Sequence, residues 1–231
     1  VVFLTSNKLL TKKQLRAAGI PTPDWMPIER SGVLQPAFAP PYIVKSVWEH
    51  ASIGLSGASV VADGESLAQE IARRRSTAEA HPLYLEAYIE GREFNLAILG
   101  AAGGEPQDLP PAEILFQRFP EGKPRIVDYA AKWDISSLEY KNTFPAFDFP
   151  PQDAPLLETL RDTALACWRL FGLSGYARVD FRVEATDRPW VLEVNSNPCL
   201  SPDAGFLAAA SRVGLGVTEV IGRIVEECLR R

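Results

Sequence analysis

The stretch ARVDFRVEATDRPWVLEVNSNP, residues 177–198, constrains the fold most, because its pattern predicts a β-hairpin with one apolar and one polar face. Apolar and charged residues alternate along its first half, and a strand sends successive side chains to opposite faces of a sheet. The segment EATDRP contains turn-forming residues and predicts the connection to the return strand. The apolar face of the first strand is formed by Ala177, Val179, Phe181 and Val183, and the polar face by Arg178, Asp180 and Arg182.

The turn also predicts which residues of the two strands face each other. If it is symmetric about positions 186 and 187, Asp180 faces Glu193 and Arg178 faces Asn195. Alternation then divides the side chains of the return strand between the two faces of the sheet. One face of that strand is expected to carry Leu192 and Val194, and the other Val191, Glu193 and Asn195.

The facing acids Asp180 and Glu193 raise the question of what keeps them together. Carboxylates directly across a strand pair lie roughly 5 Å apart and destabilise a sheet, and at an effective dielectric constant of about 20 the repulsion costs about 3 kcal/mol. One interpretation is a solvated hairpin face on which screening makes the pair harmless. The other is a divalent cation between the acids, with the Asn195 carbonyl as a third ligand. A few ligands, all of them oxygen, suit Mg²⁺ or Mn²⁺ completed by substrate phosphates, and do not suit zinc.

Length and composition limit the classes of protein that need to be considered. The chain has 231 residues, 46% of them hydrophobic, which is enough for a core in one large or two small domains. A formal net charge of −5 argues against nucleic acid as the main partner, because no basic stripe is available to neutralise phosphates. Three widely spaced cysteines form no metal pattern, and no apolar run approaches the roughly 20 residues of a membrane span. The sequence therefore predicts a soluble, cytoplasmic protein with neither nucleic-acid nor membrane partners.

Local patterns predict an α+β fold, because strands and helices are interleaved without the regular order of a doubly wound sheet. The opening VVFLTSN is read as the end of a strand and loop from something earlier in the chain. Helices are expected at 8–18, 63–76 and 153–172 and from 203 to the end; strands at 41–48, around Val60, over 83–100 with a break at Glu90-Gly91, at 112–116 and at 125–129; and a loop over 143–155.

The segment VKSVWEHASIGLSGAS is the candidate for a phosphate-binding region. The sequence contains neither G-x-x-x-x-G-K-[ST] nor a strand–G-x-G-x-x-G–helix unit. Here Lys45 lies in a strand before a loop of small residues, and such a loop can fold its backbone N–H groups over phosphates. An ordinary hairpin loop is the alternative. A lysine among apolar strand residues needs an anion close by or an exit to solvent.

In their order along the chain, these segments resemble the ATP-grasp superfamily, and within it the D-alanine–D-alanine ligase-like branch. The resemblance rests on the strand lysine with its loop, on LEAYIEGREF, DYAAKW and GYARVDF, and above all on ARVDF and LEVNSNP at this spacing. It runs from about Asn7 to Arg231. It implies two α+β subdomains with mainly antiparallel sheets that clasp a nucleotide: a connector over 1–14 and subdomains over 15–88 and 89–231.

The resemblance also implies a role for each matching residue. Arg178 would steady the acyl phosphate and the tetrahedral intermediate, and Lys132 would reach the γ-phosphate from a mobile loop. The implied ligands of Mg²⁺ (or Mn²⁺) are Asp180, Glu193 and Asn195. The implied contacts to ATP are Lys8, Lys45 and Lys132 at the phosphates, Ser52 in the covering loop, Glu86, Ala87, Tyr88 and Ile89 along the adenine, and Glu93 at the ribose.

Four residues depart from the pattern of the D-alanine ligases. Ala51 and Trp133 stand where those ligases carry a Ser and a Tyr for the first D-alanine. Ala204 stands where a Ser holds the carboxylate of the second. Cys199 replaces a Gly whose backbone N–H serves the intermediate, and both a neutral change and a role in the pocket are open for it. The residues implied for ATP are retained, whereas those for the amino acids are not.

The resemblance thus implies an ATP-dependent carboxylate–amine ligase that acts through an acyl phosphate on small substrates other than two D-alanines. The alternatives are a non-catalytic nucleotide-binding module and an ATP-dependent phosphotransferase. The retained Arg178 and Lys132 argue against a pure binding module. The ligases of this branch carry a further N-terminal domain. An N-terminal domain or a partner chain that completes the site, and a homodimer, are therefore open as partners.

Overall fold

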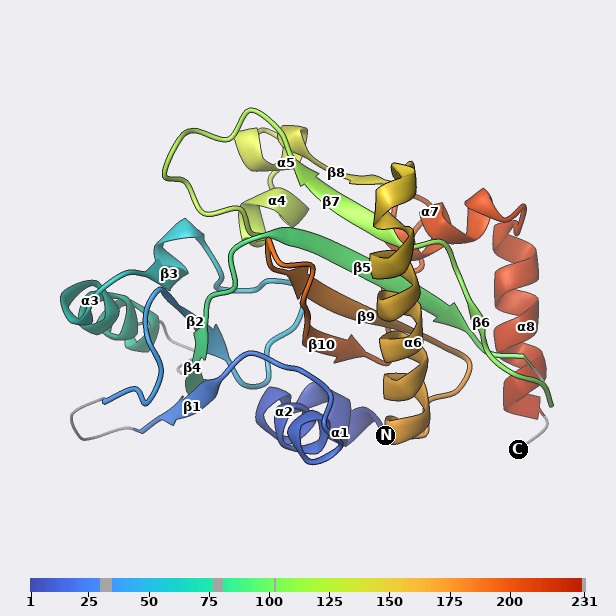
Figure 1. Ribbon diagram of the computed structural model, residues 1–231, viewed down its shortest axis with the longest axis horizontal. Coiled ribbons are helices and arrows are strands. Elements are labelled where there is room, and N and C mark those ends of the chain that lie inside the picture. The colour runs from blue at the N-terminus through green and yellow to red at the C-terminus, as the bar shows by residue number, and fades with distance from the viewer. Residues whose placement is uncertain (30–34, 77–80, 102, 230–231) are drawn as a thin grey trace.

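The computed structural model describes residues 1–29, 35–76, 81–101 and 103–229, which form two β-sheets with helices packed against them (Figure 1). One sheet has four strands in the order β1-β4-β2-β3, and the other six, in the order β10-β9-β5-β7-β8 with β6 paired to β5. The described strand pairings are antiparallel. The predicted α+β fold is therefore confirmed, while the domain boundaries near 14 and 88 stay a prediction.

The four-stranded sheet packs one face against helix α3 (Gly64–Arg75). This helix begins where the sequence predicts it, because the Asp63 carboxylate accepts the backbone N–H of Ser66 at 2.8 Å in a capping box. Val44, Leu67 and Leu85 are buried between helix and sheet. The strands are β1 (Trp25–Ile28), β2 (Tyr42–Ser46), β3 (Val60–Val61) and β4 (Leu83–Ala87), with the short 3₁₀ turn η1 (Gly57–Ser59) before β3.

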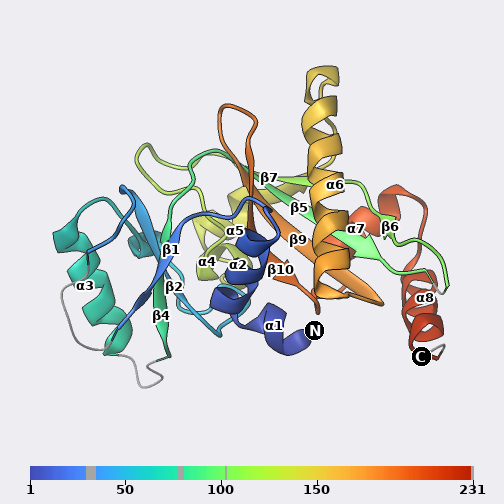
Figure 2. The same cartoon turned by 60° about the horizontal axis from the view of Figure 1, so that its bottom comes forward.

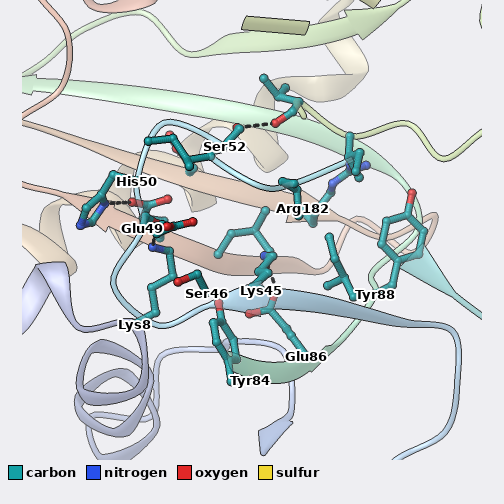
Figure 3. A pocket seen from close by; sticks show the side chains of 18 of the residues that line it. Lys8, Lys45, Ser46, Glu49, His50, Ser52, Tyr84, Glu86, Tyr88 and Arg182 are labelled. Atoms are coloured by element: carbon teal, nitrogen blue, oxygen red, sulfur yellow. Dashed lines mark hydrogen bonds and ion pairs between the residues drawn. The ribbon is translucent and has the colours of Figure 1, made fainter. Parts of the chain in front are cut away.

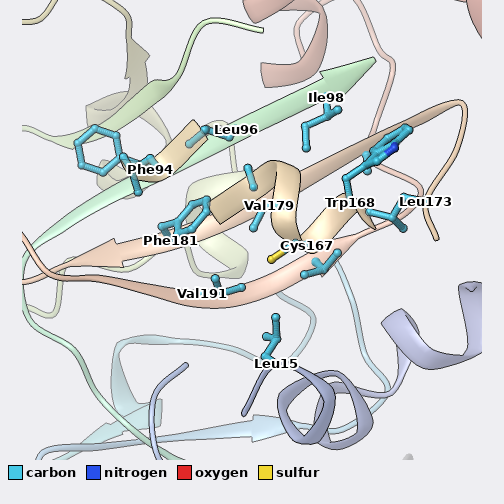
Figure 4. Close-up of a cluster of buried hydrophobic side chains, with 14 of the residues drawn as sticks. Leu15, Phe94, Leu96, Ile98, Cys167, Trp168, Leu173, Val179, Phe181 and Val191 are labelled. Atoms are coloured by element: carbon cyan, nitrogen blue, oxygen red, sulfur yellow. The ribbon is translucent and has the colours of Figure 1, made fainter. Parts of the chain in front are cut away.

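The six-stranded sheet packs one face against helix α6 (Ala154–Phe171), and this interface is the main core (Figure 4). The helix follows the 3₁₀ turn η2 (Pro151–Asp153) and ends at Gly172, whose φ of 57° is the left-handed conformation that glycine adopts most readily. Phe94, Phe181 and Leu160 are fully buried in this core. The strands are β5 (Arg92–Leu99), β6 (Gln107–Asp108), β7 (Ala112–Phe116), β8 (Thr143–Ala146), β9 (Tyr176–Val183) and β10 (Pro189–Asn195).

The remaining helices frame the sheets, as Figures 1 and 2 show. Helices α1 (Val2–Ser6) and α2 (Lys8–Ala17) contact β10, and α7 (Gly205–Arg212) and α8 (Val217–Leu229) contact β5 on the face opposite α6. Two short helices, α4 (Tyr129–Trp133) and α5 (Leu138–Asn142), contact each other near the β7–β8 edge. Part of the face opposite α6 is therefore free of α7 and α8, and it presents the polar residues of β9. No single described helix is long and apolar enough to cross a membrane; only α7 and α8 together pass that test, across a bend of 102°.

The hairpin β9–β10 has the predicted register at its functional end and a different one near its turn. Asp180 faces Glu193 and Arg178 faces Asn195, as expected, but Phe181 faces Val191, so a β-bulge lies at Leu192. The extra residue reverses the alternation beyond it. The assignment of Val191 and Leu192 to their faces was therefore wrong. Val191 is 1% exposed in the core, and Leu192 lines a cavity on the opposite face.

Several other local predictions are also wrong. The opening VVFLTSN is helical in α1 and has no strand partner among the described residues. Residues 125–129 form no ladder, because the carbonyls of Arg125 and Val127 accept hydrogen bonds from the side chains of Arg182 and Ser52. Strand β8 lies within the expected loop 143–155 and pairs with β7. Strands β1 and β6 were not predicted.

Candidate functional site

A cavity of about 130 Å³ lies between the two sheets (Figure 3). Strands β2 and β4 of the four-stranded sheet line it on one side, and β9 and β10 of the other sheet line it on the opposite side. Of the predicted site residues, Arg178 and Asn195 do not line it. Those that do are Lys8, Lys45, Ser52, Glu86, Ala87, Tyr88, Ile89, Glu93, Lys132, Asp180 and Glu193.

The anion that Lys45 requires is Glu86, whose side chain is 1% exposed. Lys45 Nζ lies 2.5 Å from Glu86 Oε1, and Lys12 Nζ lies 2.6 Å from Oε2. The contact between Lys12 and Glu86 is a close ion pair whose geometry does not meet that of a hydrogen bond. Burial alone would raise the pKa of Glu86, but the two lysines hold it below its ordinary value. Burial lowers the pKa of Lys12 to about 8 against the opposing effect of Glu86. The carboxylate is thus ionised and fixed between two cations.

Lys8 and Glu193 also line the cavity, together with His50, which the sequence analysis did not single out. Glu193 Oε1 lies 3.1 Å from His50 Nδ1, and Lys8 donates a hydrogen bond to the carbonyl of Glu49. Burial alone would raise the pKa of Glu193, but Lys8, His50 and Lys132 lower it. Burial lowers the pKa of Lys8 against the opposing effect of Glu193. Glu193 is therefore ionised.

The negative charges of Asp180 and Glu193 are each offset by a basic side chain of the protein, Arg178 and His50. Their mutual repulsion therefore does not by itself require a metal ion. Arg178 donates two hydrogen bonds to Asp180, at 2.6 and 2.8 Å, and Asn95 donates a third at 2.9 Å. The Asn195 amide oxygen accepts the backbone N–H of Asn197 at 2.9 Å. Among the described residues, no group of three or more His, Cys, Asp or Glu side chains is placed to hold a metal ion. The carboxylates of Asp180 and Glu193 and the amide oxygen of Asn195 can each accept more bonds than they do here, so these residues fit a magnesium ion. The magnesium assignment stays a prediction.

Glu93 is buried and pairs with a residue that the sequence analysis placed on the polar face without a role. Arg182 Nη2 lies 3.0 Å from Glu93 Oε2, and the same guanidinium donates to the carbonyl of Gly91 at 2.9 Å. Burial raises the pKa of Glu93, and Arg182 opposes the shift. Arg182 is 3% exposed, so this pair forms a rigid end of the cavity beside β4 and β5.

Hydrogen bonds join two segments that flank the cavity. The hydroxyl of Ser52 donates to the Val127 carbonyl at 2.6 Å, and the backbone N–H of Tyr129 donates to the Leu55 carbonyl at 3.0 Å. Lys132 lies in helix α4 and not in the loop that the resemblance implied, because the Asp128 carboxylate caps this helix by accepting the Ala131 N–H.

The residues that depart from the D-alanine ligase pattern make contacts of their own. The indole N–H of Trp133 donates to the carbonyl of Ala51 at 2.9 Å, so these two positions hold the flanking segments together. Cys199 is exposed, and its sulfur lies 3.0 Å from the Ser201 hydroxyl. Ala204 is the N-cap residue that precedes helix α7, and it provides no side-chain cap.

Sequence reasoning missed His50, Lys12 and Leu192, and the signals for them differ. Lys12 stands four residues after Lys8, which places both on one face of α2. This spacing could have identified it. His50 lies in a loop without periodicity, and Leu192 reaches the cavity only because of the bulge. Neither position had a usable signal.

Two antiparallel α+β units that enclose a cavity lined by both lysines and acids define a domain of the ATP-grasp class. The chain belongs to the family described as the D-ala D-ala ligase C-terminus, whose sequence model matches residues 14–226.

Proteins similar in sequence or in structure include D-alanine–D-alanine ligases. A D-alanine–D-alanine ligase of a Synechococcus species is 32% identical over 99% of this chain and 66% of its own. An uncharacterized protein of Sinorhizobium fredii is 30% identical over 99% of this chain and 64% of its own. The solved D-alanine–D-alanine ligase of Bacillus anthracis is 25% identical with a TM-score of 0.75, over 98% of this chain and 68% of its own. A structure of the Bacillus anthracis enzyme complexed with ATP has the same fold, with a TM-score of 0.74 at 24% identity. The chain thus spans about two thirds of the length of these curated relatives.

Proposed function

We propose that this domain binds Mg-ATP in the cavity between the sheets and activates a carboxylate for ligation to an amine. The observation that carries the proposal is the convergence of Lys8, Lys45 and Lys132 with Asp180 and Glu193 on one cavity. A polyphosphate chain needs cations from the protein and a metal held by acids, and this cavity offers both sets of groups. The ATP complex of the Bacillus anthracis ligase, which shares the fold, supports the choice of nucleotide.

The assignment of roles follows the charges. Lys8 and Lys45 would bind phosphates, and the segment 86–89, which begins at the end of β4 beside Lys45, would contact the adenine. Asp180 and Glu193, with the amide oxygen of Asn195, would hold Mg²⁺. When bound, the ion would offset charge on the transferred phosphoryl group.

The proposed reaction has two steps. A carboxylate oxygen of the substrate forms a bond to the γ-phosphorus of ATP while the bond to the ADP oxygen breaks. The amine nitrogen then bonds to the acyl carbon, loses a proton, and phosphate leaves. Lys132 and Arg178 would stabilise the negative charge that develops in these steps. The Arg178 guanidinium is held by Asp180, so it is oriented before the substrate binds.

The substrates are proposed to differ from two D-alanines, because Ala51, Trp133 and Ala204 lack the hydroxyls expected of those ligases. Each missing hydrogen-bond partner costs about 1–3 kcal/mol. Efficient synthesis of D-alanyl-D-alanine would contradict this part of the proposal.

The test is calorimetric titration of the 231-residue chain with Mg-ADP and Mg-ATP, followed by assays of ADP and phosphate release. We expect Mg-dependent binding that Lys45→Met weakens at least about tenfold, since it removes a phosphate contact. The exposed Lys13→Met, which removes the same charge, is the control. Release of ADP that requires an amine indicates a ligase, whereas release without one indicates a phosphotransferase. No nucleotide binding by the wild-type chain would overturn the proposal.

A further inference from the structure

Arg182 is a buried arginine of β9 whose side chain joins three other segments of the chain. It is 3% exposed and stands opposite Glu93 of the neighbouring strand β5. Its Nη1 donates to the carbonyl of Gly91 at 2.9 Å, and its Nη2 donates to the carbonyl of Arg125 and lies 3.0 Å from Glu93 Oε2. One guanidinium therefore fixes the link between β4 and β5, the segment that precedes α4, and a carboxylate of the cavity between the sheets.

Two aromatic rings lie close to the same guanidinium. Its carbon Cζ is 5.7 Å from the centre of the Tyr88 ring and 5.8 Å from that of the Phe116 ring. Both distances suit cation–π attraction, which adds to the hold of the hydrogen bonds. In the view of Figure 3, Arg182 and Tyr88 lie on one side of the cavity and Lys8 lies on the other. Arg182 is thus held by the protein itself, on the side away from Lys8.

Glu93 is the group through which Arg182 can act on the cavity. Its carboxylate is paired with Arg182 through Oε2, and Oε1 accepts no hydrogen bond from any residue that the structure describes. Burial raises the pKa of Glu93, and Arg182 opposes this rise more than Lys132 and Lys45 do, while Asp180 adds to it. The two lysines are proposed to bind phosphates. Arg182 is therefore the cation that stays with Glu93 when a nucleotide is bound.

We propose that Arg182 is a positioning residue that gives this site its preference for a ribonucleotide, because it holds Glu93 charged and oriented so that Oε1 accepts the ribose hydroxyls. Arg182 itself does not touch the nucleotide. The inference rests on the proposed function, since it concerns the ribose of the nucleotide that the cavity is proposed to bind. A hydrogen bond to a charged group changes an affinity at least about tenfold, whereas one to a neutral group changes it less.

The experiment measures by calorimetry how tightly the 231-residue chain binds Mg-ADP and Mg-2′,3′-dideoxy-ADP, which lacks both hydroxyls. The readout is the ratio of the dissociation constant of the dideoxy nucleotide to that of ADP, because a merely structural defect weakens both alike. The wild-type ratio should be at least about 10. Arg182→Met should lower it to about 3 or less. Arg182→Lys keeps the cation but cannot reach both carbonyls and the carboxylate, so its ratio should lie between the two. It also tests the inference if the methionine variant does not fold.

Arg92→Met is the matched control for loss of an ion-paired arginine. Arg92 precedes Glu93 on β5 and donates to the carboxylates of Glu113 and Asp153, and it does not line the cavity. Its replacement should leave the ratio unchanged. Glu93→Gln should lower the ratio by itself. Addition of Arg182→Met to Glu93→Gln should lower it no further, because Arg182 acts through Glu93.

Three results would overturn the inference. A wild-type ratio near 1 would show that Glu93 does not select the ribose, although Mg-ADP binding would still support the nucleotide part of the proposed function. An unchanged ratio in the Arg182 variants that fold would leave Arg182 a structural residue. An equal fall of the ratio in Arg92→Met would trace the effect to a general loosening of β5. If the wild-type chain binds no Mg-ADP, the proposed function itself is rejected and the inference falls with it.

Discussion

Replacement of Lys12 by methionine tests the electrostatics of the buried carboxylate beside the nucleotide cavity. The ammonium group is 1% exposed, lies 2.6 Å from Glu86 and donates to the Thr22 hydroxyl at 2.9 Å. Burial lowers its pKa to about 8, from 10.5 in an unfolded chain. Methionine has a similar length and no charge, and it leaves Glu86 paired with Lys45.

The expected magnitude follows from the pKa difference of Lys12. The difference is 10.5 − 8, or 2.5 units, and each unit corresponds to about 1.36 kcal/mol, so the total is about 3 kcal/mol. Between these two pKa values the unfolded chain binds more protons than the folded one, so stability rises with pH. The free energy of unfolding of the wild type should thus increase by about 2–3 kcal/mol relative to the methionine variant between pH 7.5 and 10.

Urea denaturation of both proteins at intervals of pH measures this difference. Lys13→Met is the matched control, because Lys13 is exposed on the same helix and its replacement removes the same charge. Its pH profile should run parallel to that of the wild type. If the Lys12→Met profile is parallel as well, the pKa of Lys12 is the same in the folded and the unfolded chain, and the lowering of this pKa by burial is wrong.

Two other substitutions test the site and the hairpin. Glu193→Gln should reduce Mg-dependent ATP turnover at least about tenfold, while the exposed Glu90→Gln should not; equal turnover would reject the metal role. Gly91→Ala places a Cβ 1.9 Å from the Val183 carbonyl oxygen at a φ of 145°, and should lower the free energy of unfolding by more than about 2 kcal/mol. Gly64→Ala has open space around it and should cause no such loss in thermal or urea unfolding.

The hairpin shows how far the sequence could predict this protein and where it could not. Strict alternation predicted the buried face of β9, and the assumed turn predicted that Asp180 faces Glu193. The bulge at Leu192 was not predictable, because an extra residue in one strand changes no local propensity and becomes visible only when the partner strand is known. The functional end of the hairpin was therefore correct, and the residues nearer its turn were not.

Electrostatic partners were the least predictable part of the site. The need of Lys45 for an anion followed from its apolar neighbours, but Glu86 could be identified as that anion only from the pairing of β2 with β4. The partner of Glu193 could not be predicted either, because His50 lies 143 positions away in the sequence and only the fold brings the two side chains together. The expected strand at 125–129 failed because side chains took the hydrogen bonds that a neighbouring strand would have made.

Strand β9 has a consequence for how this domain can change over evolutionary time. Its odd-numbered residues, such as Val179 and Phe181, lie in the core with α6, and its even-numbered residues Asp180 and Arg182 line the cavity between the sheets. Substitution at an even position alters the chemistry and leaves the core intact. Insertion or deletion of one residue within the strand would exchange the two sets and damage both. New specificities can therefore arise by single substitutions on one face of this strand, whereas its length must stay fixed.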